Sequence, residues 1–404
     1  METFAPSKAI TALFMGLSLS IGLFAQIPDT RYKVLYRFQA SEGGWSPYTA
    51  GVTFDSAGNL YGTTEYGGAG MQGDNGVVYK LDTAGNYTVL YNFCSLTDCS
   101  DGSQPYAGVI LDSAGNLYGT TVAGGAFGRG VVFKLDTAGQ FSVLHSFDGG
   151  ADGSNPTCGL ALDSAGNLFG TATSGGTGGG AGGVVFKLDT ANNYTVLYNF
   201  CGLAGCTDGA QPLAGVTIDS AGNLYGTTRF GGGPPHTGGY GVVYKLDTAG
   251  NYTVLYDLTN SGAYYVPGVI LDSAGNLYGT TAYGGTDNHG VVFKVDTAGN
   301  YTVLYNFCSL AECADGSEPY SGVILDSAGN LYGSTYLGGI TNDVCKRMGC
   351  GTVFRLDTKG NLTTLHSFVK PSGGLPYAGL IQDSKGDLYG TTDAGEGLVF
   401  KLKP

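Results

Sequence analysis

Charged side chains are scarce in this chain of 404 residues, and basic side chains are the scarcest of them. Lysine and arginine together number 19 against 32 acidic residues, which gives a formal net charge of −13. Binding to nucleic acid needs clustered Lys and Arg side chains that neutralise phosphates, so we expect no nucleic-acid partner. An acidic exterior of this kind mainly favours solubility.

Motifs that mark common enzyme sites are also missing. The sequence contains no G-x-S-x-G elbow, phosphate-binding loop, dinucleotide fingerprint or H-E-x-x-H helix. Its one long apolar run, residues 9–25, follows Lys8 and ends at Ala25, a residue suited to cleavage. We therefore predict a signal peptide over residues 1–25, a mature chain with no membrane span, and a secreted or periplasmic location. An uncleaved anchor is the alternative, although the run is short for a span of about 20 residues.

Glycine is abundant, with 72 residues, and much of it belongs to a repeated phrase. DSAGNLYGTT or a close variant occurs seven times, with 51 to 57 residues between successive copies. Its first residues are Asp55, Asp112, Asp163, Asp219, Asp272, Asp326 and Asp383. A period near fifty is typical of propellers and other repeat arrays. Units that cannot each bury a face must share one body, so residues 26–404 are predicted to form one domain.

The second copy reads as four strands. Residues 107–111 (AGVIL) form a short apolar strand, and residues 116–121 (NLYGTT) return from it after an Asp-Ser-Ala-Gly turn. Residues 130–135 (GVVFKL) form the third strand, and residues 140–147 (QFSVLHSF) form the fourth after a similar turn. Alternation in the fourth strand predicts one shared face for Phe141, Val143, His145 and Phe147. Four antiparallel strands, labelled A to D from the axis outwards, make one propeller blade.

The two ends of the chain predict how the array closes. The seventh copy stops after its third strand, residues 397–402, while residues 32–38 (YKVLYRF) match the fourth strand YTVLYNF of other copies. An open array would need capping units instead. We predict an all-β, seven-bladed β-propeller of four-stranded antiparallel blades, monomeric and closed by the N-terminal strand. A parallel β-helix is the competing fold, but its rungs are much shorter than this unit.

The two faces of such a ring differ in sequence. The A–B and C–D turns are nearly the same in every copy, whereas the D–A and B–C connections vary in length and composition. Since ligands are usually bound by variable loops on a rigid scaffold, we predict a binding surface on the D–A/B–C face, around the channel mouth. The repeated turn aspartates are expected to form Asx turns, because their spacing does not match a calcium-binding loop.

A repeated acidic phrase on the variable face leaves two interpretations open. The phrase is D-G-S or D-G-A, and it stands in the D–A loops before a proline. It predicts a turn, with a ring of carboxylates near the channel as the alternative. These aspartates are Asp101, Asp152, Asp208 and Asp315.

Cysteines also fall in the loops of the variable face. Eight of the nine form pairs with four residues between them, which favours local disulfides over a four-thiolate zinc site. Disulfides there would hold a loop surface rigid, or simply stabilise long glycine-rich loops outside the cell. The pairs are Cys94/Cys99, Cys201/Cys206, Cys308/Cys313 and Cys345/Cys350, with Cys158 left over.

Few side chains on this face are candidates for chemistry. His236 and His289 lie in B–C loops of neighbouring copies with Asp287 nearby, a weak acid–base or metal candidate, and we predict no cofactor and no metal. His145 and His366 replace a repeated tyrosine and are expected to be packed. Aromatic residues outside the repeat pattern are candidates for stacking against a sugar or peptide: Trp45, Tyr66, Phe230, Tyr264, Tyr265, Tyr283 and Tyr336. Aromatic residues that recur within the repeats are expected in the core.

The unit GVILDSAGNLYGTT…GGxxGVVFKLDTAGNYTVLYNF resembles the GloVer tandem repeat of bacterial exported proteins, over residues 32–402. The resemblance implies a secreted or surface location and often a C-terminal sorting anchor. This chain ends at Pro404 without such a tail, so release or periplasmic retention is expected. The family implies no activity and no catalytic residues. More distantly, the blade is similar to NHL-type repeats, which are mostly binding platforms but include a propeller lyase.

Three functions follow as hypotheses. The first is an exported, non-catalytic binding or scaffold module that recognises an extracellular glycan, peptide or protein through the D–A/B–C face. The alternative is a lyase or hydrolase with its site at the channel mouth, and the third is a purely structural surface protein. The lack of an ordered acid–base set in the sequence favours the first.

Overall fold

The computed structural model describes residues 30–40, 43–70, 73–178, 182–233, 239–260, 264–341, 345, 348–370 and 373–404. The predicted signal peptide and His236 lie outside these residues, and both stay predictions. Arg31–Pro404 form one compact unit. Within the described residues, no helix is long and apolar enough to cross a bilayer.

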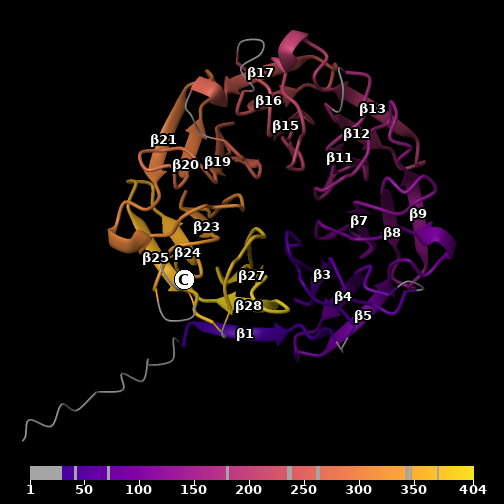
Figure 1. Ribbon diagram of the computed structural model, residues 1–404, viewed down its shortest axis with the longest axis horizontal. Helices are drawn as coiled ribbons and strands as arrows, with labels where there is room; N and C mark the ends of the chain where they lie inside the picture. Colours follow the sequence, from indigo (N-terminus) through magenta and orange to yellow (C-terminus); the bar gives the residue numbers. More distant parts are fainter. Residues whose placement is uncertain are drawn as a thin grey trace, which may run out of the picture. The chain divides into compact units, whose positions relative to one another are not determined.

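Seven four-stranded antiparallel sheets stand in a ring around a central opening (Figure 1). The prediction of a seven-bladed β-propeller is confirmed. Blades 1 to 6 follow one another along the chain, each in the order A–B–C–D from the axis outwards. Blade 7 combines three C-terminal strands with the N-terminal strand β1.

The strands occupy equivalent positions in every blade. The A strands are β2 (Thr53–Phe54), β6 (Ile110–Leu111), β10 (Ala161–Leu162), β14 (Thr217–Ile218), β18 (Val269–Leu271), β22 (Ile324–Leu325) and β26 (Ile381–Gln382). The B strands are β3 (Leu60–Thr64), β7 (Leu117–Thr121), β11 (Leu168–Ala172), β15 (Leu224–Thr227), β19 (Leu277–Thr281), β23 (Leu331–Thr335) and β27 (Leu388–Thr392). The C strands are β4 (Val77–Leu81), β8 (Val131–Leu135), β12 (Val184–Leu188), β16 (Val242–Leu246), β20 (Val291–Val295), β24 (Thr352–Leu356) and β28 (Leu398–Leu402). The D strands are β5 (Tyr87–Asn92), β9 (Phe141–Ser146), β13 (Tyr194–Asn199), β17 (Tyr252–Asp257), β21 (Tyr301–Asn306), β25 (Leu362–Ser367) and β1 (Tyr32–Arg37).

Among the fully described segments, short 3-10 helices follow four of the D strands: η2 (Thr97–Cys99), η3 (Ala204–Cys206), η4 (Leu258–Asn260) and η5 (Ala311–Cys313). Three of these helices end on the second cysteine of a disulfide. These three disulfides therefore lie where the chain leaves the rim of one blade and turns towards the axis of the next.

Ring closure occurs where the chain ends meet. Strand β1 pairs antiparallel with β28, with Tyr32 opposite Leu402 and Arg37 opposite Leu398. Figure 1 shows the indigo β1 beside the yellow β28. Two further backbone bonds extend the ladder, from Phe38 N to Gly397 O and from Lys403 N to Arg31 O. The predicted closure is confirmed.

Packing in the structure explains each of the last three residues of the repeated segment NLYGTT. A Cβ added at Gly119 would lie 2.6 Å from the ring of Phe133, so only glycine lets this C-strand aromatic cross the B strand. The Thr120 hydroxyl donates to the Cys158 carbonyl of the next blade at 3.0 Å, and equivalent threonines do so in five other blades. The Thr121 hydroxyl donates to the carbonyl of Ala123 within its own B–C loop. The repeat thus encodes contacts between blades as well as within them.

The turn aspartates form the predicted Asx turns. In blade 1, Asp55 Oδ1 accepts from the backbone N–H groups of Ala57 and Asn59, both at 2.9 Å. Its Oδ2 accepts from the Asn59 side chain and the Tyr61 hydroxyl. Burial alone would raise the pKa of Asp55, but the hydrogen bonds led by Asn59 outweigh it and hold that pKa below its ordinary value. These oxygens serve as hydrogen-bond acceptors in the turn, which is the structural role that we predicted.

The predicted shared face of the fourth strand is wrong. Phe141 stacks on Tyr91 of blade 1, whereas His145 and Phe147 pack on Tyr194 of blade 3. A β-bulge in β9 leaves His145 opposite Val132 and Val143 opposite Phe133, so Leu144 is the extra residue. Val143 turns outwards and is 37% exposed, while Leu144 packs on the buried cluster. Simple alternation fails because a bulge inserts one residue and reverses the pattern after it.

Both rim histidines are packed, as predicted. His145 stacks on Tyr194 of the next blade with 3.8 Å between ring centroids, and His366 stacks on Tyr32 at 3.9 Å. The His145 Nε2 atom also lies 2.9 Å from Asp152 Oδ2. The contact of His366 involves β1, so it bridges blades 6 and 7 at the ring closure.

Candidate functional site

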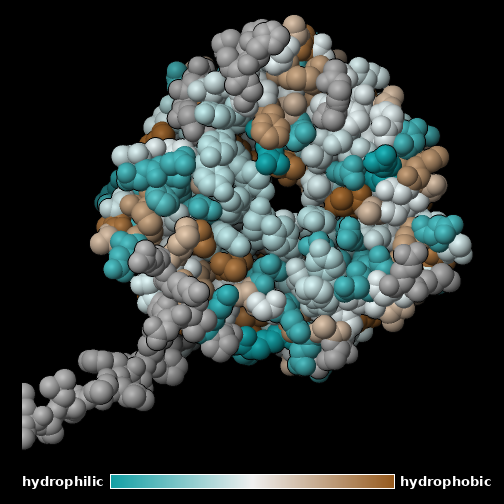
Figure 2. Space-filling view, in the orientation of Figure 1, coloured by the Kyte–Doolittle hydropathy of each residue, from teal (hydrophilic) through white to brown (hydrophobic). Residues whose placement is uncertain are grey.

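A cavity of about 460 Å³ opens at the axis, where the D–A segments of all seven blades approach one another. We call it the channel cavity. Its wall is made by the residues that precede the A strands, with Arg229 added from the B–C connection of blade 4. Figure 2 shows a small opening at the centre of the ring, with weakly hydrophilic side chains along its left side. Its volume lies within the range of about 300–1,000 Å³ of small-molecule sites.

Four tyrosines from blades 1, 5, 6 and 7 pack together on one side of the cavity. We call Tyr48, Tyr265, Tyr320 and Tyr377 the tyrosine plug. The Tyr377 ring stacks on Tyr48 and on Tyr320, with centroids 4.4 and 4.8 Å apart. The hydroxyls of Tyr265 and Tyr377 are 2.7 Å apart and hydrogen-bonded. On the other side, smaller residues such as Thr157 and Leu213 occupy the equivalent positions of blades 3 and 4.

The tyrosine plug continues into the surrounding loops. Tyr336 packs edge-on against Tyr320 and Tyr377, and the Tyr283 hydroxyl bonds to that of Tyr320. Burial raises the pKa of Tyr377 and, with the hydrogen bond to Tyr283, that of Tyr320. These hydroxyls therefore stay neutral near pH 7, where each can both donate and accept a hydrogen bond.

The open side of the cavity carries one cation. The guanidinium carbon of Arg229 lies 4.8 Å from the centroid of the Phe230 ring and 5.7 Å from that of Tyr265. The Arg229 side chain is exposed, and no carboxylate of a described residue pairs with it. Aromatic contacts rather than an ion pair therefore hold the guanidinium at the rim of the cavity.

Acidic side chains lie on the plug side. Glu65 and Asp393 follow the B strands of blades 1 and 7, and Glu65 is only 5% exposed. Asp393 Oδ1 accepts from the Ser46 hydroxyl at 2.8 Å. Burial, followed by the repulsion from Glu65, raises the pKa of Asp393 despite the Ser46 bond.

This raised pKa gives a pH-dependent prediction. Since Asp393 binds its proton more tightly in the folded chain, ionisation opposes folding as the pH rises through and above the unfolded Asp value of about 3.9. We expect Asp393→Asn to raise the urea midpoint at pH 7 and to leave it nearly unchanged at about pH 3.5. The control Asp112→Asn should lower the midpoint at pH 7, because hydrogen bonds led by Asn116 outweigh burial and hold the pKa of Asp112 below its ordinary value. A lower midpoint for Asp393→Asn at pH 7 would contradict this assignment.

Four of the predicted aromatic candidates belong to the channel cavity or its border. Tyr265 lines the cavity, and Tyr283 and Tyr336 contact the plug. Phe230 lies under Arg229 and is 42% exposed. The structure thus brings these rings together around the axis, on the face where we predicted a binding surface.

The other three aromatic candidates lie further out. Tyr264 stacks on Tyr283 with 4.8 Å between centroids, so it touches the cavity only through that ring. Trp45 and Tyr66 stack on each other over blade 1, at 4.7 Å, and the Trp45 Nε1–H donates to Asp74. Trp45 borders a separate groove whose wall includes Gly67, Gly68 and Val89.

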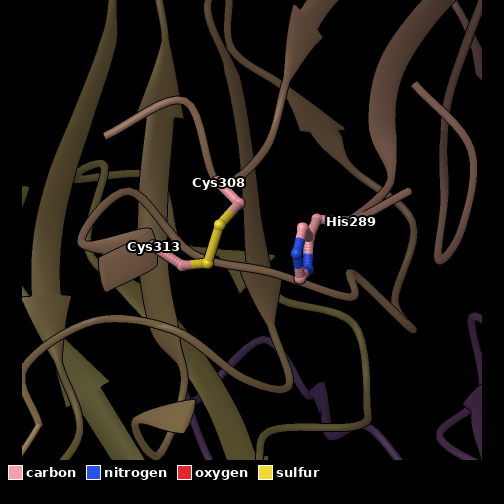
Figure 3. A group of neighbouring side chains, drawn as sticks. All are labelled: His289, Cys308 and Cys313. Carbon is pink, nitrogen blue, oxygen red and sulfur yellow. A yellow bond between two sulfur atoms is a disulfide. The ribbon is translucent and has the colours of Figure 1, made fainter. Parts of the chain in front are cut away.

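His289 does not belong to the channel cavity. Its Nδ1 lies 2.8 Å from the Ser317 hydroxyl, and its ring faces the Cys308–Cys313 disulfide (Figure 3). The two sulfur atoms are bonded to each other, so they are not thiolate ligands for a metal beside His289. Asp287, in the same loop, is exposed.

The predicted cysteine pairing is confirmed, and the four-thiolate zinc alternative is therefore wrong. Cys158 is free and buried in the wall of the channel cavity, where burial raises the pKa of its thiol. The four disulfides are Cys94–Cys99, Cys201–Cys206, Cys308–Cys313 and Cys345–Cys350.

Cys350 lies in the core and not at the surface of its loop. Its side chain is only 2% exposed and belongs to a buried cluster of blades 6 and 7 that includes Val353, Phe368 and Leu398. The reason is its position two residues before β24, where the B–C connection has already entered the core between the two blades. The Leu375 N–H donates to the Cys350 carbonyl at 2.8 Å and fixes the segment there.

Cys345, the partner of Cys350, is buried in the same cluster at 7% exposure. This disulfide therefore adds to the hydrophobic core and offers no surface to a ligand. Cys94 is also buried, although it belongs to a D–A loop, while its partner Cys99 is half-buried. Plain stabilisation, the other role that we expected for the disulfides, fits these positions better than support of a binding surface.

The D-G-S aspartates form turns rather than a carboxylate ring. Asp101 is fully buried and accepts from the Tyr91 hydroxyl at 2.7 Å and from the Ser95 and Leu96 N–H groups. Asp208 and Asp315 make the same contacts in the D–A loops that follow blades 3 and 5. Each of these carboxylates fastens a D–A loop to the rim of the preceding blade.

Sequence reasoning missed four tyrosines of the channel cavity. Tyr48, Tyr106, Tyr320 and Tyr377 recur in the repeats, and we therefore expected them in the core. The missed signal was a Pro-Tyr pair just before the A strand, as in QPYAG, EPYSG and LPYAG. The residue before that proline has a positive φ, 53° at Glu318, and the chain turns there towards the axis.

A ring of seven four-stranded blades with a cavity at its axis defines a β-propeller. Within that class, the chain belongs to the Gloeobacter/Verrucomicrobia repeat family, which matches residues 22–233 and 235–404. Comparison with curated proteins finds no match.

Several solved structures share the fold at low sequence identity. A chain of the mitotic checkpoint complex is 14% identical, with a TM-score of 0.57, over 100% of this chain and 99% of that one. A puromycin hydrolase is 11% identical, with a TM-score of 0.54, over 89% of this chain and 52% of that one. A gluconolactonase from Xanthomonas campestris is 17% identical, with a TM-score of 0.44, over 72% of this chain and 83% of that one. The two likenesses with TM-scores above 0.5 concern the fold alone.

Proposed function

We propose that this protein is an exported, non-catalytic binding propeller that holds its ligand in the channel cavity on the D–A/B–C face. The observation that carries the proposal is the tyrosine plug, which turns one side of the cavity into a wall of aromatic rings and hydroxyls. Rigid aromatic side chains with polar tips are typical of binding sites, because they give contact area at a low cost in conformational entropy. Four disulfides are consistent with a location outside the cytoplasm.

Among a glycan, a peptide and a protein, the lining favours a glycan. The wall offers the hydroxyls of Tyr48, Tyr106 and Thr157 beside aromatic and small apolar surface. The hydroxyls of Thr49 and Ser321 are already bonded to Tyr106 and Ser334. Sugars present both ring hydroxyls and apolar ring faces, which such a wall can satisfy together. A cavity at the narrow axis also suits a compact segment better than a broad protein surface.

The test measures binding of glycan and peptide arrays, followed by calorimetry on the strongest ligand. We expect Tyr377→Ala to weaken binding by about tenfold or more, because it removes a ring stacked on two others and the bond to Tyr265. Tyr377→Phe keeps the stacking and should cost less. The control Tyr118→Ala removes a tyrosine of the DSAGN face, whose hydroxyl bonds to Asp112, and should leave affinity unchanged. Equal affinity of wild type and Tyr377→Ala, with both folded, would refute this site.

The lyase or hydrolase alternative has one observation in its favour. Asp393 is a partly buried carboxyl group with a raised pKa, caused first by burial and then by a second acid, Glu65, and acids of this kind often serve in proton transfer. Turnover of the strongest ligand that is lost in Asp393→Asn would establish this alternative. If the ligand binds tightly and no product is released, the protein is a binding module and the enzyme alternative fails.

A further inference from the structure

The channel cavity is electrically asymmetric. Three acids, Glu65, Glu318 and Asp393, lie behind the cavity wall in blades 1, 6 and 7, next to the tyrosines on the side of the tyrosine plug. Glu318 Oε2 accepts from the Tyr320 hydroxyl at 3.3 Å, and burial together with the charge of Glu65 raises the pKa of Tyr106 to about 12. Arg229, on blade 4, supplies the cavity's only guanidinium among the described lining residues. A negatively charged group is therefore repelled by the plug side and attracted to blade 4.

The surroundings of the Arg229 side chain favour binding of an anion from outside the protein. Its guanidinium is held by the rings of Phe230 and Tyr265, and no described carboxylate neutralises it. A guanidinium supported in this way has lost part of its conformational freedom before binding, and its planar fork matches a carboxylate in two parallel hydrogen bonds. Among the described residues, none therefore gives Arg229 the ion pair that a structural arginine would have.

The neighbours of Arg229 suit a sugar ring that carries the carboxylate. Thr157, Leu213 and Ala214 line the open side with smaller side chains than the plug. Arg229 lies over the Tyr265 ring, whose hydroxyl bonds to Tyr377 and can also accept a bond from a sugar hydroxyl. A pyranose can occupy this space with its carboxylate at Arg229 and its remaining hydroxyls towards the plug.

We propose that the channel cavity selects an acidic glycan, in which a uronate carboxylate is held by Arg229 and neighbouring sugars contact the tyrosine plug. This inference rests on the proposed glycan-binding function and adds the charge of the ligand and the residue that reads it. Arg229 is then the residue that determines specificity, while the plug supplies affinity that does not depend on charge.

The experiment compares matched ligand pairs by calorimetry on the whole chain. The probes are trisaccharides of galacturonate, mannuronate, guluronate and glucuronate, each beside its methyl ester, together with neutral glycans and peptides with free or amidated C-termini. We expect at least one uronate to bind about tenfold or more tightly than its ester. Arg229→Gln should remove that difference, Arg229→Lys should keep part of it, and the ester should bind both variants like the wild type. Arg129→Gln, which alters an arginine in the B–C connection of blade 2, is the matched control and should change nothing.

The outcomes separate this inference from the function on which it rests. Two results would overturn the acidic-glycan assignment and leave glycan binding intact. The first is that neutral glycans bind more tightly than every uronate, and the second is that the preference for uronates persists in Arg229→Gln. Preference for peptides with a free C-terminus over all glycans overturns the assignment in favour of a peptide carboxylate. Absence of binding to every probe overturns both proposals.

Discussion

A chain that lacks residues 1–38 will not form the closed ring, and moving β1 to the other terminus will restore it. The deletion removes the ladder between β1 and β28 and leaves the C-strand edge of blade 7 unpaired. It also removes Phe38, which is 3% exposed and whose burial alone stabilises by about 1.5–3 kcal/mol. The loss extends to both neighbouring blades, because Tyr32 stacks on His366 and Tyr36 stacks on Tyr87 at 4.4 Å. Together these contacts are comparable with a typical total stability of about 5–15 kcal/mol.

The measurement is the urea midpoint and the elution volume of three chains. These are the chain from residue 26, the chain from residue 39, and a permutant in which residues 32–40 follow Leu402 through an Asp-Thr-Ala-Gly-Asn turn, so that five residues separate Leu402 from its partner Tyr32 as they separate Leu81 from Tyr87. We expect the permutant to match the first chain, because the other six blades join their C and D strands through such turns. The chain from residue 39 should be unfolded or aggregated. A monomeric truncated chain with an unchanged midpoint would contradict the role of β1 in closure.

Gly130→Ala will destabilise the ring far more than Gly139→Ala. Both glycines have a positive φ, +96° and +81°, so both substitutions carry the left-handed strain of about 1–2 kcal/mol. At Gly130 the added Cβ would also lie 2.2 Å from the Thr121 carbonyl oxygen and 2.8 Å from Pro156 of the next blade. Overpacking against such atoms costs about 1–3 kcal/mol more, and here one of them is backbone, which cannot move aside alone.

The difference between the two variants isolates the close approach of blades 2 and 3. A Cβ at Gly139 would meet no atom within 4 Å, so this variant is the matched control for backbone strain. Urea unfolding of the two purified variants, followed by intrinsic fluorescence and circular dichroism, gives the comparison. Equal midpoints would show that the contact near Pro156 relaxes without cost.

The architecture could be predicted from the sequence because the same four-strand pattern occurs in seven copies. The D-S-A-G-N turns, the apolar strands and the matching fragments at residues 32–38 and 397–402 all depend on local chemistry that a short window contains. The bulge at Leu144 could not be predicted, because it depends on the register between β8 and β9, which neighbouring residues do not fix. The A strands are also shorter than expected, since the residues before Ile110 line the axis instead of pairing.

The sequence predicted a binding surface around the channel mouth, and the structure has a cavity there, but most of its lining was not predicted. The variable loops on which that prediction rested contain Tyr265, Tyr283 and Tyr336. The Pro-Tyr residues were missed because recurrence in a repeat suggests a buried role, whereas in a ring every recurrent residue next to strand A converges on one axis. The place of Arg229 in the cavity could not be predicted from the sequence, because it depends on the Phe230 and Tyr265 rings that the fold brings beside its guanidinium.

Burial of the cysteines was the other feature that spacing could not supply. A gap of four residues indicates that Cys345 and Cys350 can reach each other, and this holds equally on a surface loop and in a core. The depth of Cys350 depends on where its segment meets blade 7, through residues about 20 positions further along the chain such as Phe368 and Leu375. A short window of sequence does not contain that contact.

The pairing of β1 with β28 also sets an order of events during biosynthesis. The earliest strand to be made waits for the latest three, and at about 5–20 residues per second the roughly 360 residues between them take on the order of 20–70 s. During that interval β1 has no β28 to pair with, so synthesis must finish before the ring can close. If the protein is exported as proposed, this strand order keeps the ring unclosed while the chain crosses the membrane through a translocation pore. The closed propeller then forms after export.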